Sequence, residues 1–443
     1  GLKVIIDQVL SHSSSEHPFF KESRQNRTNP KADWYVWADP HHDGSPPNNW
    51  ISIFGGIAWQ WESRRHQYYL HNFLVEQPDF NFHNPEVQDW LLSTMRFWLE
   101  RGVDGFRLDT VNFYFHDKLL RSDPADYRRK DKPDWNPYAM QYHIFSKNQP
   151  ENLAFLERMR ALLDEFDART MVGEMGEDHH PIRMMGEYTS GKRLHMCYSF
   201  EMLKDPFSAT HFRTLIEEFY TGAPNGWPCW AFSNHDVVRH ATRWKDYGVS
   251  NEALAKQAGA LLLSLQGSIC MYEGEELGQT ESDLDYSELT DPQGLRFWPE
   301  NKGRDGCRTP MVWDANKPNA GFSDAKPWLP VKPEQAAHSV AGQVDNPNSA
   351  LNFYKKMLRF RKASDALKYG ATSFLDTKEP ILAYLRAPNL LCVFNLSPTE
   401  QHLTLNGQVT EVLAEGLKLD AGKMSLAGNG FAFFEVAGEV SIS

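Results

Sequence analysis

The segment from Gly102 to Asn112 constrains the fold more than any other part of the 443-residue chain. Its sequence, Gly-Val-Asp-Gly-Phe-Arg-Leu-Asp-Thr-Val-Asn, predicts a short buried strand that ends on a cation and a carboxylate. Because strand side chains alternate between two faces, Arg107 and Asp109 share one face. A cation beside a carboxylate keeps it ionised, which is the state needed for attack on an electrophilic carbon. An ordinary salt bridge at a strand end is the structural alternative.

Two further predicted strands also end on acids. The apolar run from Thr170 stops at Glu174, and the run from Trp230 stops at Asp236, with His235 beside it. In a parallel α/β fold the carboxyl ends of the strands meet on one face, where active sites are built. Three acids accompanied by an arginine and a histidine therefore indicate an active site.

Helical and strand periodicities surround these strand ends. Helices are expected over 84–101 and 152–166, over 211–220 and 252–265, and over 349–361. A buried strand is expected over 4–9, and further strands over 194–200 and 269–272. Alternation of strands and helices indicates βαβ units, whereas the period-two pattern after Gly370 indicates a separate antiparallel domain.

Six segments, in order, resemble the α-amylase family of glycoside hydrolases (family 13), close to its bacterial α-glucosidase and oligo-1,6-glucosidase branch. They are Asp7–His12, Gln77–Asn81, Gly105–Asp109, Val172–Glu174, Ser233–Asp236 and Tyr272–Gly278.

The resemblance implies an α/β (β/α)8 TIM barrel. Strand 3 would lie in residues 1–12, an inserted B domain in 13–80, the rest of the barrel in 81–368 with a long insertion at 276–346, and a C-terminal antiparallel β domain in 369–443. On this expectation the first two strand-helix units are missing from the chain. That missing part is also where a structural Ca or Mg ion could bind.

The resemblance implies three catalytic carboxylates: Asp109 as nucleophile, Glu174 as general acid/base and Asp236 as stabiliser of the transition state. A retaining glycosidase needs one ionised and one protonated carboxyl about 5–5.5 Å apart. Arg107 would keep Asp109 charged. Glu174, on an apolar strand near other carboxylates, is expected to have a raised pKa.

Further residues are expected around the sugar. By resemblance, His12 and His235 grip the non-reducing glucose and Arg304 reaches its pocket, although a lone histidine is more often a satisfied core residue. Phe54 and Phe73 are candidates for the pocket wall, and Phe200 for the mouth of its strand, with core packing as the alternative. In the family that the chain resembles, valine at position 110 accompanies α-1,6 cleavage and threonine or alanine accompanies α-1,4 cleavage, so Thr110 implies preference for α-1,4 linkages. The structural alternative is that the Thr110 hydroxyl bonds its own backbone.

Composition limits the partners. A net charge of −12 and a pI of about 5.8 argue against nucleic acid. No apolar run has the length of a membrane span. The five cysteines fit no metal-ligand spacing and indicate a reducing, cytoplasmic location. A periplasmic location stays open, because the sequence starts without methionine.

The expected function is that of a retaining, exo-acting α-glucosidase acting on short α-glucosides, with transglucosylation, as a monomer or homodimer that needs no metal or other cofactor for the chemistry. Oligo-1,6-glucosidase, sucrose isomerase and trehalose synthase activities share the same machinery and are alternatives. A non-catalytic barrel relative is a minor alternative, because all three acids and Arg107 are present.

Overall fold

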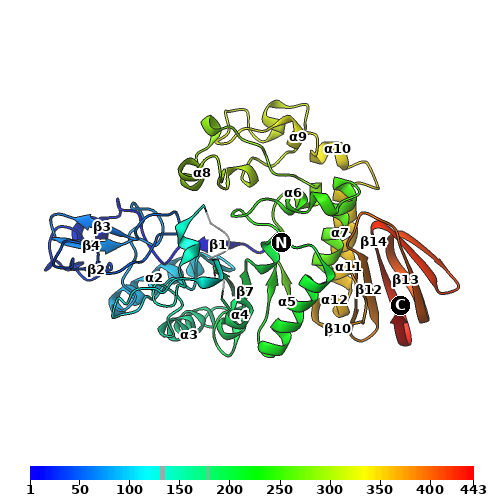
Figure 1. Ribbon diagram of the computed structural model, residues 1–443, viewed down its shortest axis with the longest axis horizontal. Helices are drawn as coiled ribbons and strands as arrows, with labels where there is room; N and C mark the ends of the chain where they lie inside the picture. Colours follow the sequence, from blue (N-terminus) through cyan, green and yellow to red (C-terminus); the bar gives the residue numbers. More distant parts are fainter. Residues whose placement is uncertain (130–134, 177–178) are drawn as a thin grey trace. The chain divides into compact units, whose positions relative to one another are not determined.

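The computed structural model describes residues 1–129, 135–176 and 179–443, which form two compact units (Figure 1). The first unit comprises residues 1–199 and 225–227. The second comprises residues 200–224 and 228–443. Each unit is described by itself.

A four-stranded parallel sheet forms the centre of the first unit. Its strand order is β1-β5-β6-β7, and its register places Arg107 between Asp7 of β1 and Val172 of β6. The strands are β1 (Ile5–Gln8), β5 (Gly105–Leu108), β6 (Thr170–Met175) and β7 (Met196–Ser199). The predicted strands around Arg107 and Glu174 are therefore confirmed.

Helices connect these strands, and the two that the periodicity predicts over 84–101 and 152–166 are confirmed. Helix α2 (Pro85–Glu100) begins at Asn84, whose side chain accepts a hydrogen bond from the Glu86 backbone N–H at 2.9 Å. Proline at the first helical position lacks an N–H that would otherwise have no partner. Helix α3 (Glu151–Leu163) precedes β6, and α4 (Pro181–Thr189) precedes β7.

The prediction that the first strand is buried is wrong. Val4 is 56% exposed and Ile5 44% exposed. Within the described residues β1 hydrogen-bonds to one neighbour, β5, so its other edge and much of its apolar surface face solvent.

The segment 13–80 contains its own small antiparallel sheet, of order β2-β4-β3, and a buried hydrophobic cluster that includes Trp50 and Trp59. Its elements are α1 (Pro18–Ser23), β2 (Trp37–Ala38), β3 (Trp59–Glu62) and β4 (Gln67–Leu70).

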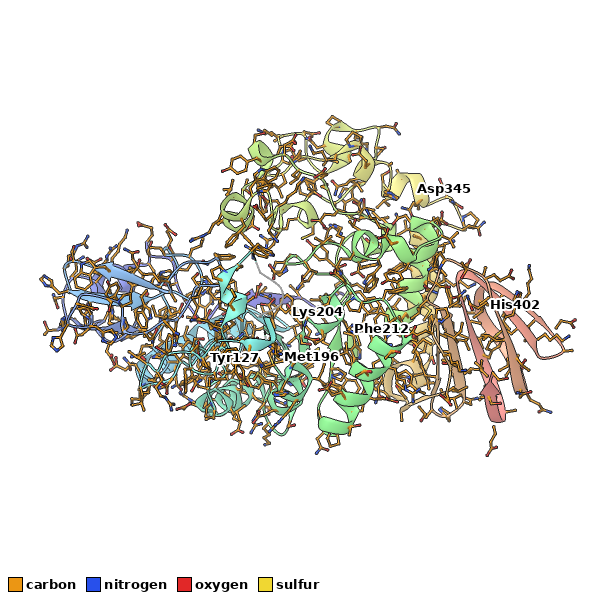
Figure 2. All side chains as sticks on the ribbon, in the orientation of Figure 1. Tyr127, Met196, Lys204, Phe212, Asp345 and His402 are labelled. Atoms are coloured by element: carbon orange, nitrogen blue, oxygen red, sulfur yellow. The ribbon has the colours of Figure 1, made fainter. Side chains whose placement is uncertain are left out.

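The second unit begins with a helical layer. Phe212 of α5, labelled in Figure 2, lies within 6.1 Å, ring centre to ring centre, of Phe207, Phe232 and Trp244. The helices before the C-terminal sheet are α5 (Ala209–Gly222), α6 (His240–Arg243), α7 (Asn251–Ser264), α8 (Pro292–Phe297), α9 (Pro333–Ala336), α10 (Val340–Gln343), α11 (Ala350–Ala363) and α12 (Asp365–Tyr369).

Two predicted strands of this unit are shorter than expected. Strand β8 (Cys229–Trp230) pairs in parallel with β9 (Ser268–Ile269) over two residues. Asp236 therefore does not end a strand. Instead it lies in a loop whose start is anchored in two ways. The ring centre of Phe232 lies 5.1 Å from that of Trp244, and the Ser233 hydroxyl accepts from the His240 backbone N–H at 2.9 Å.

The predicted C-terminal antiparallel sheet is confirmed, with strand order β10-β11-β12-β14-β13 (orange to red in Figure 1). One face buries a cluster that includes Leu391, Val393, Leu426 and Phe434, as alternation requires. The strands are β10 (Thr372–Phe374), β11 (Ile381–Arg386), β12 (Leu390–Asn395), β13 (Gln401–Asp420) and β14 (Lys423–Ile442).

Candidate active site

Arg107 joins the carboxylates of the first unit. Its Nη1 lies 2.5 Å from Asp109 Oδ1 and 2.9 Å from Asp7 Oδ2, and its Nη2 lies 2.7 Å from Glu174 Oε1. Neighbouring strands produce this arrangement, because β5 supplies the arginine, β6 supplies Glu174 and Asp109 directly follows β5. The predicted proximity of Arg107 and Asp109 is confirmed.

These partners keep the guanidinium of Arg107 protonated. Burial alone would lower the pKa of its guanidinium, but the oxygens of Tyr198 and of the three carboxylates outweigh burial and raise this pKa above its usual value. One permanent cation therefore serves both candidate catalytic acids.

Glu174 is 3% exposed, and both of its oxygens are bonded. The Tyr198 hydroxyl donates to Oε1 at 3.1 Å, and the Thr110 backbone N–H donates to Oε2 at 3.2 Å. Burial favours the neutral acid, whereas Arg107 and these donors favour the carboxylate. The expected rise in the pKa of Glu174 therefore stays a prediction.

The sequence reasoning missed Tyr198. The sequence feature that could have identified it is the alternation of side chains along β7, which places Tyr198 on the same face as Met196. Asp7 was placed in the expected strand over 4–9 but was not recognised as a partner of Arg107.

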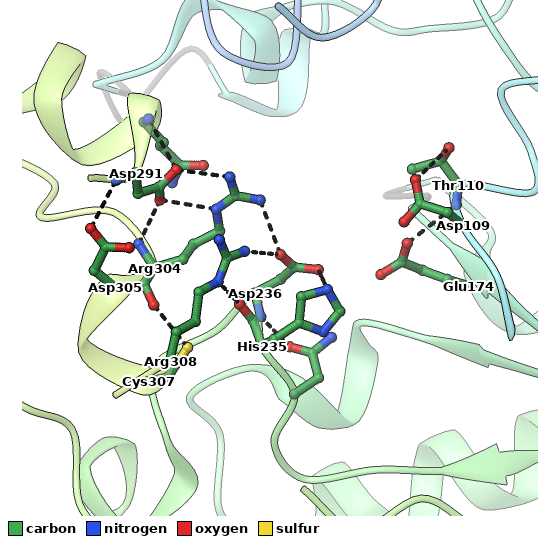
Figure 3. A network of polar contacts seen from close by, with 12 residues as sticks. Asp109, Thr110, Glu174, His235, Asp236, Asp291, Arg304, Asp305, Cys307 and Arg308 are labelled. Atoms are coloured by element: carbon green, nitrogen blue, oxygen red, sulfur yellow. Dashed lines mark hydrogen bonds and ion pairs between the residues drawn. The ribbon is translucent and has the colours of Figure 1, made fainter. Parts of the chain in front are cut away.

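Thr110, directly after Asp109, has a φ of +41°, which is unusual for a β-branched residue. Its hydroxyl donates to Asp109 Oδ2 at 3.4 Å and lies 3.2 Å from the Ser11 hydroxyl. The Thr110 hydroxyl thus contacts the side chains of Asp109 and Ser11 rather than its own backbone. Figure 3 labels Asp109, Thr110 and Glu174.

His12 lies close enough to Asp109 for the two side chains to interact electrostatically. Burial lowers its pKa to about 4, and the negative charge of Asp109 opposes that shift only in part. The ring of Phe73 lies 5.1 Å from the His12 ring, and Phe54, which is buried, lies 6.1 Å from Phe73. Phe73 therefore contacts a predicted sugar-binding residue, and Phe54 contacts Phe73.

In the second unit, Asp236 is held by two arginines (Figure 3). Its Oδ1 lies 3.0 Å from Arg304 Nη1 and 2.9 Å from Arg308 Nη2, and its Oδ2 lies 3.3 Å from His235 Nε2. The structure brings together the predicted residues His235, Asp236 and Arg304. Arg308 was missed because its segment has no periodicity.

Asp291 fixes the orientation of Arg304. It accepts from Arg304 Nε at 3.0 Å, from Nη2 at 2.8 Å and from the Arg304 backbone N–H at 2.7 Å. Burial raises the pKa of Asp291, but Arg304 outweighs burial and holds this pKa below its usual value. A bidentate pair of this kind directs the remaining guanidinium nitrogen toward Asp236.

Phe200 directly follows β7 and belongs to the second unit.

Among residues 1–129, 135–176 and 179–443, no group of three or more His, Cys, Asp or Glu side chains could hold a metal ion. Within the same residues no helix is long and apolar enough to cross a bilayer.

Comparisons with known proteins agree with this chemistry. The family model "Alpha amylase, catalytic domain" matches residues 1–370. The chain is 52% identical to a probable α-glucosidase of Rhizobium meliloti (strain 1021), over 95% of this chain and 80% of that protein. It is 33% identical to an oligo-1,6-glucosidase of Heyndrickxia coagulans, over 90% and 76% of the two chains. A crystal structure of the α-glucosyl transfer enzyme XgtA is similar with a TM-score of 0.95 and 50% identity, over 99% of this chain and 83% of that chain.

Proposed function

Because the chain belongs to the α-amylase family of glycoside hydrolases and is a glycosidase of its α-glucosidase branch, we propose that it is a retaining, exo-acting α-glucosidase. It releases glucose from the non-reducing end of short α-glucosides. The observation that supports this most is the contact of one guanidinium, that of Arg107, with both Asp109 and Glu174.

The reaction has two steps. Asp109 attacks the anomeric carbon while Glu174 donates its proton to the glycosidic oxygen, so that the sugar becomes an ester of Asp109 and the aglycone leaves. Glu174, now ionised, takes a proton from water as that water attacks the same carbon, and Asp109 is released. Each step inverts the configuration of the anomeric carbon, so the two steps together retain it. No cofactor takes part.

Transglucosylation follows from the same intermediate when a sugar hydroxyl replaces water. The likeness to an α-glucosyl transfer enzyme supports this second activity. Oligo-1,6-glucosidase, sucrose isomerase and trehalose synthase activities are the alternatives in which the acceptor or the linkage differs.

The other roles rest on the family motifs. Asp236 is the carboxylate that stabilises the transition state, His12 and His235 line the glucose pocket, and Arg304 serves the same pocket. In the second unit Arg304 also holds Asp236, so its loss would disturb a carboxylate in addition to any sugar contact.

Preference for α-1,4 linkages is assigned to Thr110. A hydroxyl has one proton and two lone pairs. The proton goes to Asp109 and one lone pair faces Ser11, which leaves one lone pair to accept from a hydroxyl of the acceptor sugar. Valine has no such acceptor.

For the fold, β1, β5, β6 and β7 with β8 and β9 are proposed to be strands three to eight of a (β/α)8 barrel, with 13–80 as an inserted domain and 369–443 as the C-terminal domain. A reducing, cytoplasmic location is proposed from the sequence, because the five cysteines are odd in number and lie far apart.

The test is incubation of the protein with maltose, isomaltose and sucrose, with products and their initial anomer identified by ¹H NMR. Maltose should be cleaved faster than isomaltose. With p-nitrophenyl α-glucoside, whose leaving group is not a glucose, α-glucose should appear before β-glucose, and initial β-glucose from this substrate would contradict a retaining mechanism. Isomerisation of sucrose as the main reaction would favour the isomerase alternative.

A further inference from the structure

Five side chains of the first unit form one continuous chain of hydrogen bonds that ends on the proposed nucleophile. Gln77 Nε2 lies 3.0 Å from His12 Nε2, and His12 Nδ1 lies 2.9 Å from Ser11 Oγ. Ser11 Oγ lies 3.2 Å from Thr110 Oγ1, which lies 3.4 Å from Asp109 Oδ2. Gln77 and Ser11 have no role in the two-step reaction above.

The direction of this chain is set at Gln77. The backbone N–H of Leu74 donates to Gln77 Oε1 at 3.0 Å, so the amide nitrogen is the atom that faces His12. An amide nitrogen only donates. His12 Nε2 must therefore accept, and the single ring proton of the neutral imidazole lies on Nδ1.

The remaining links follow from proton counting. His12 Nδ1–H donates to Ser11 Oγ, so the Ser11 proton is directed away from the ring and toward Thr110. The Thr110 proton then goes to Asp109, because a carboxylate only accepts. Ser11 is 2% exposed, so water has little access to replace this central link.

The chain requires a neutral imidazole, since a doubly protonated ring would face the amide nitrogen of Gln77 with a second N–H. Burial, which lowers the pKa of His12 to about 4, keeps the ring neutral at pH 7.

We propose that Gln77 and Ser11 are positioning residues, which fix the Nδ1–H tautomer of His12 and thereby direct a one-way chain of donors onto Asp109. The chain stabilises the ionised nucleophile and holds its Oδ2, while Arg107 holds Oδ1. This role deepens the proposed function and rests on Asp109 being the nucleophile.

Three variants test this chain of hydrogen bonds. Ser11→Ala removes the central link. Gln77→Glu keeps an acceptor for Leu74 but presents His12 Nε2 with an oxygen that only accepts, which favours a proton on Nε2. Ser13→Ala is the matched control, because the Ser13 hydroxyl bonds Tyr35 and the Ser14 carbonyl, outside the chain.

The first readout is ¹⁵N NMR of ring-labelled histidine, with His12→Gln used only to assign the signal. The wild-type protein at pH 7 should show His12 protonated on Nδ1, and Gln77→Glu should show a proton on Nε2. A wild-type His12 protonated on Nε2 would overturn the proposal. This readout needs no catalysis, so it stands apart from the proposed function.

The second readout is the pH profile of kcat/KM for p-nitrophenyl α-glucoside. In Gln77→Glu the Ser11 proton turns to His12 and the Thr110 proton can turn to Ser11, so Asp109 loses its donor, its pKa rises and the acid limb should move up by about 0.5–1 pH unit. In Ser11→Ala the Thr110 hydroxyl loses the donor that polarises it, so the acid limb should move in the same direction by a smaller amount. Ser13→Ala should match wild type. An unshifted acid limb in a folded Ser11→Ala or Gln77→Glu protein would refute the proposed chain of hydrogen bonds from Gln77 to Asp109. If Ser11→Ala does not fold, the wild-type tautomer and Gln77→Glu decide. Wild-type inactivity on every α-glucoside would instead refute the proposed function.

Discussion

Thr110 donates its backbone N–H to Glu174 Oε2 at 3.2 Å, and it does so with a φ of +41°. A β-branched residue in this region costs on the order of 1–3 kcal/mol and persists only where its surroundings fix it. The turn after β5 thus contributes a backbone donor to the proposed acid, in addition to the nucleophile at position 109.

Tyr198→Phe should move the alkaline limb of kcat upward. The Tyr198 hydroxyl donates to Glu174 Oε1, and losing a donor to the carboxylate raises the pKa of the acid. Glu174 then stays protonated to higher pH, by about 0.5–1 unit. The pH profile of kcat on maltose checks this, and a downward shift would contradict the assigned contact.

Gly105→Ala should impair both stability and catalysis. A Cβ at this position would collide with the Thr170 carbonyl oxygen of β6, so the strands that place Arg107 and Glu174 must separate. Overpacking of this kind costs roughly 1–3 kcal/mol. Thermal unfolding and kcat measure the effect.

Gly222→Ala is the matched control for this variant, because its Cβ would meet nothing within 4 Å. Equal melting temperatures and kcat values for Gly105→Ala and wild type would show that the two strands can separate without consequence.

The sequence predicted the parts of the site that follow regular elements. Arg107, Asp109 and Glu174 lie on or directly after strands with clear alternation, so their shared face could be read from period two. The segments that contain Ser11, Gln77 and Arg308 show neither the helical nor the strand periodicity of apolar residues. Their contacts arise from loops that meet only in the folded chain, and for the same reason the loop at Asp236 was taken for a strand.

Glu275 should make stability fall as pH rises. Burial raises its pKa to about 8 from a usual value of 4.5, and neither carboxylate oxygen has a hydrogen-bond partner among the described residues. Between these two values the folded state holds a proton that the unfolded state releases, so the free energy of unfolding decreases with pH.

Glu275→Gln removes this titration. Its free energy of unfolding at pH 8 should exceed that of wild type by roughly 1–3 kcal/mol, with a smaller difference at pH 5. Denaturant unfolding at both pH values measures the difference, with exposed Glu411→Gln as control. The same difference at both pH values would mean that Glu275 is ionised in the fold.

Thr110→Val should change linkage preference. The variant loses the acceptor for a sugar hydroxyl, a contact worth about 1–3 kcal/mol where it is buried, so the ratio of kcat/KM for maltose to that for isomaltose should fall about fivefold or more. Loss of the donor to Asp109 affects both substrates and cancels in this ratio. An unchanged ratio would show that Thr110 does not determine the linkage preference.

The identity of the nucleophile is tested most directly by a mechanism-based fluoroglucoside, whose glycosyl ester accumulates on the attacking carboxylate and is located by peptide mass spectrometry. The proposed mechanism predicts the label on Asp109 in wild type, no label in a folded Asp109→Asn variant, and a fall in kcat of that variant by roughly 10⁴-fold or more. A label on Glu174 or Asp236 would contradict it.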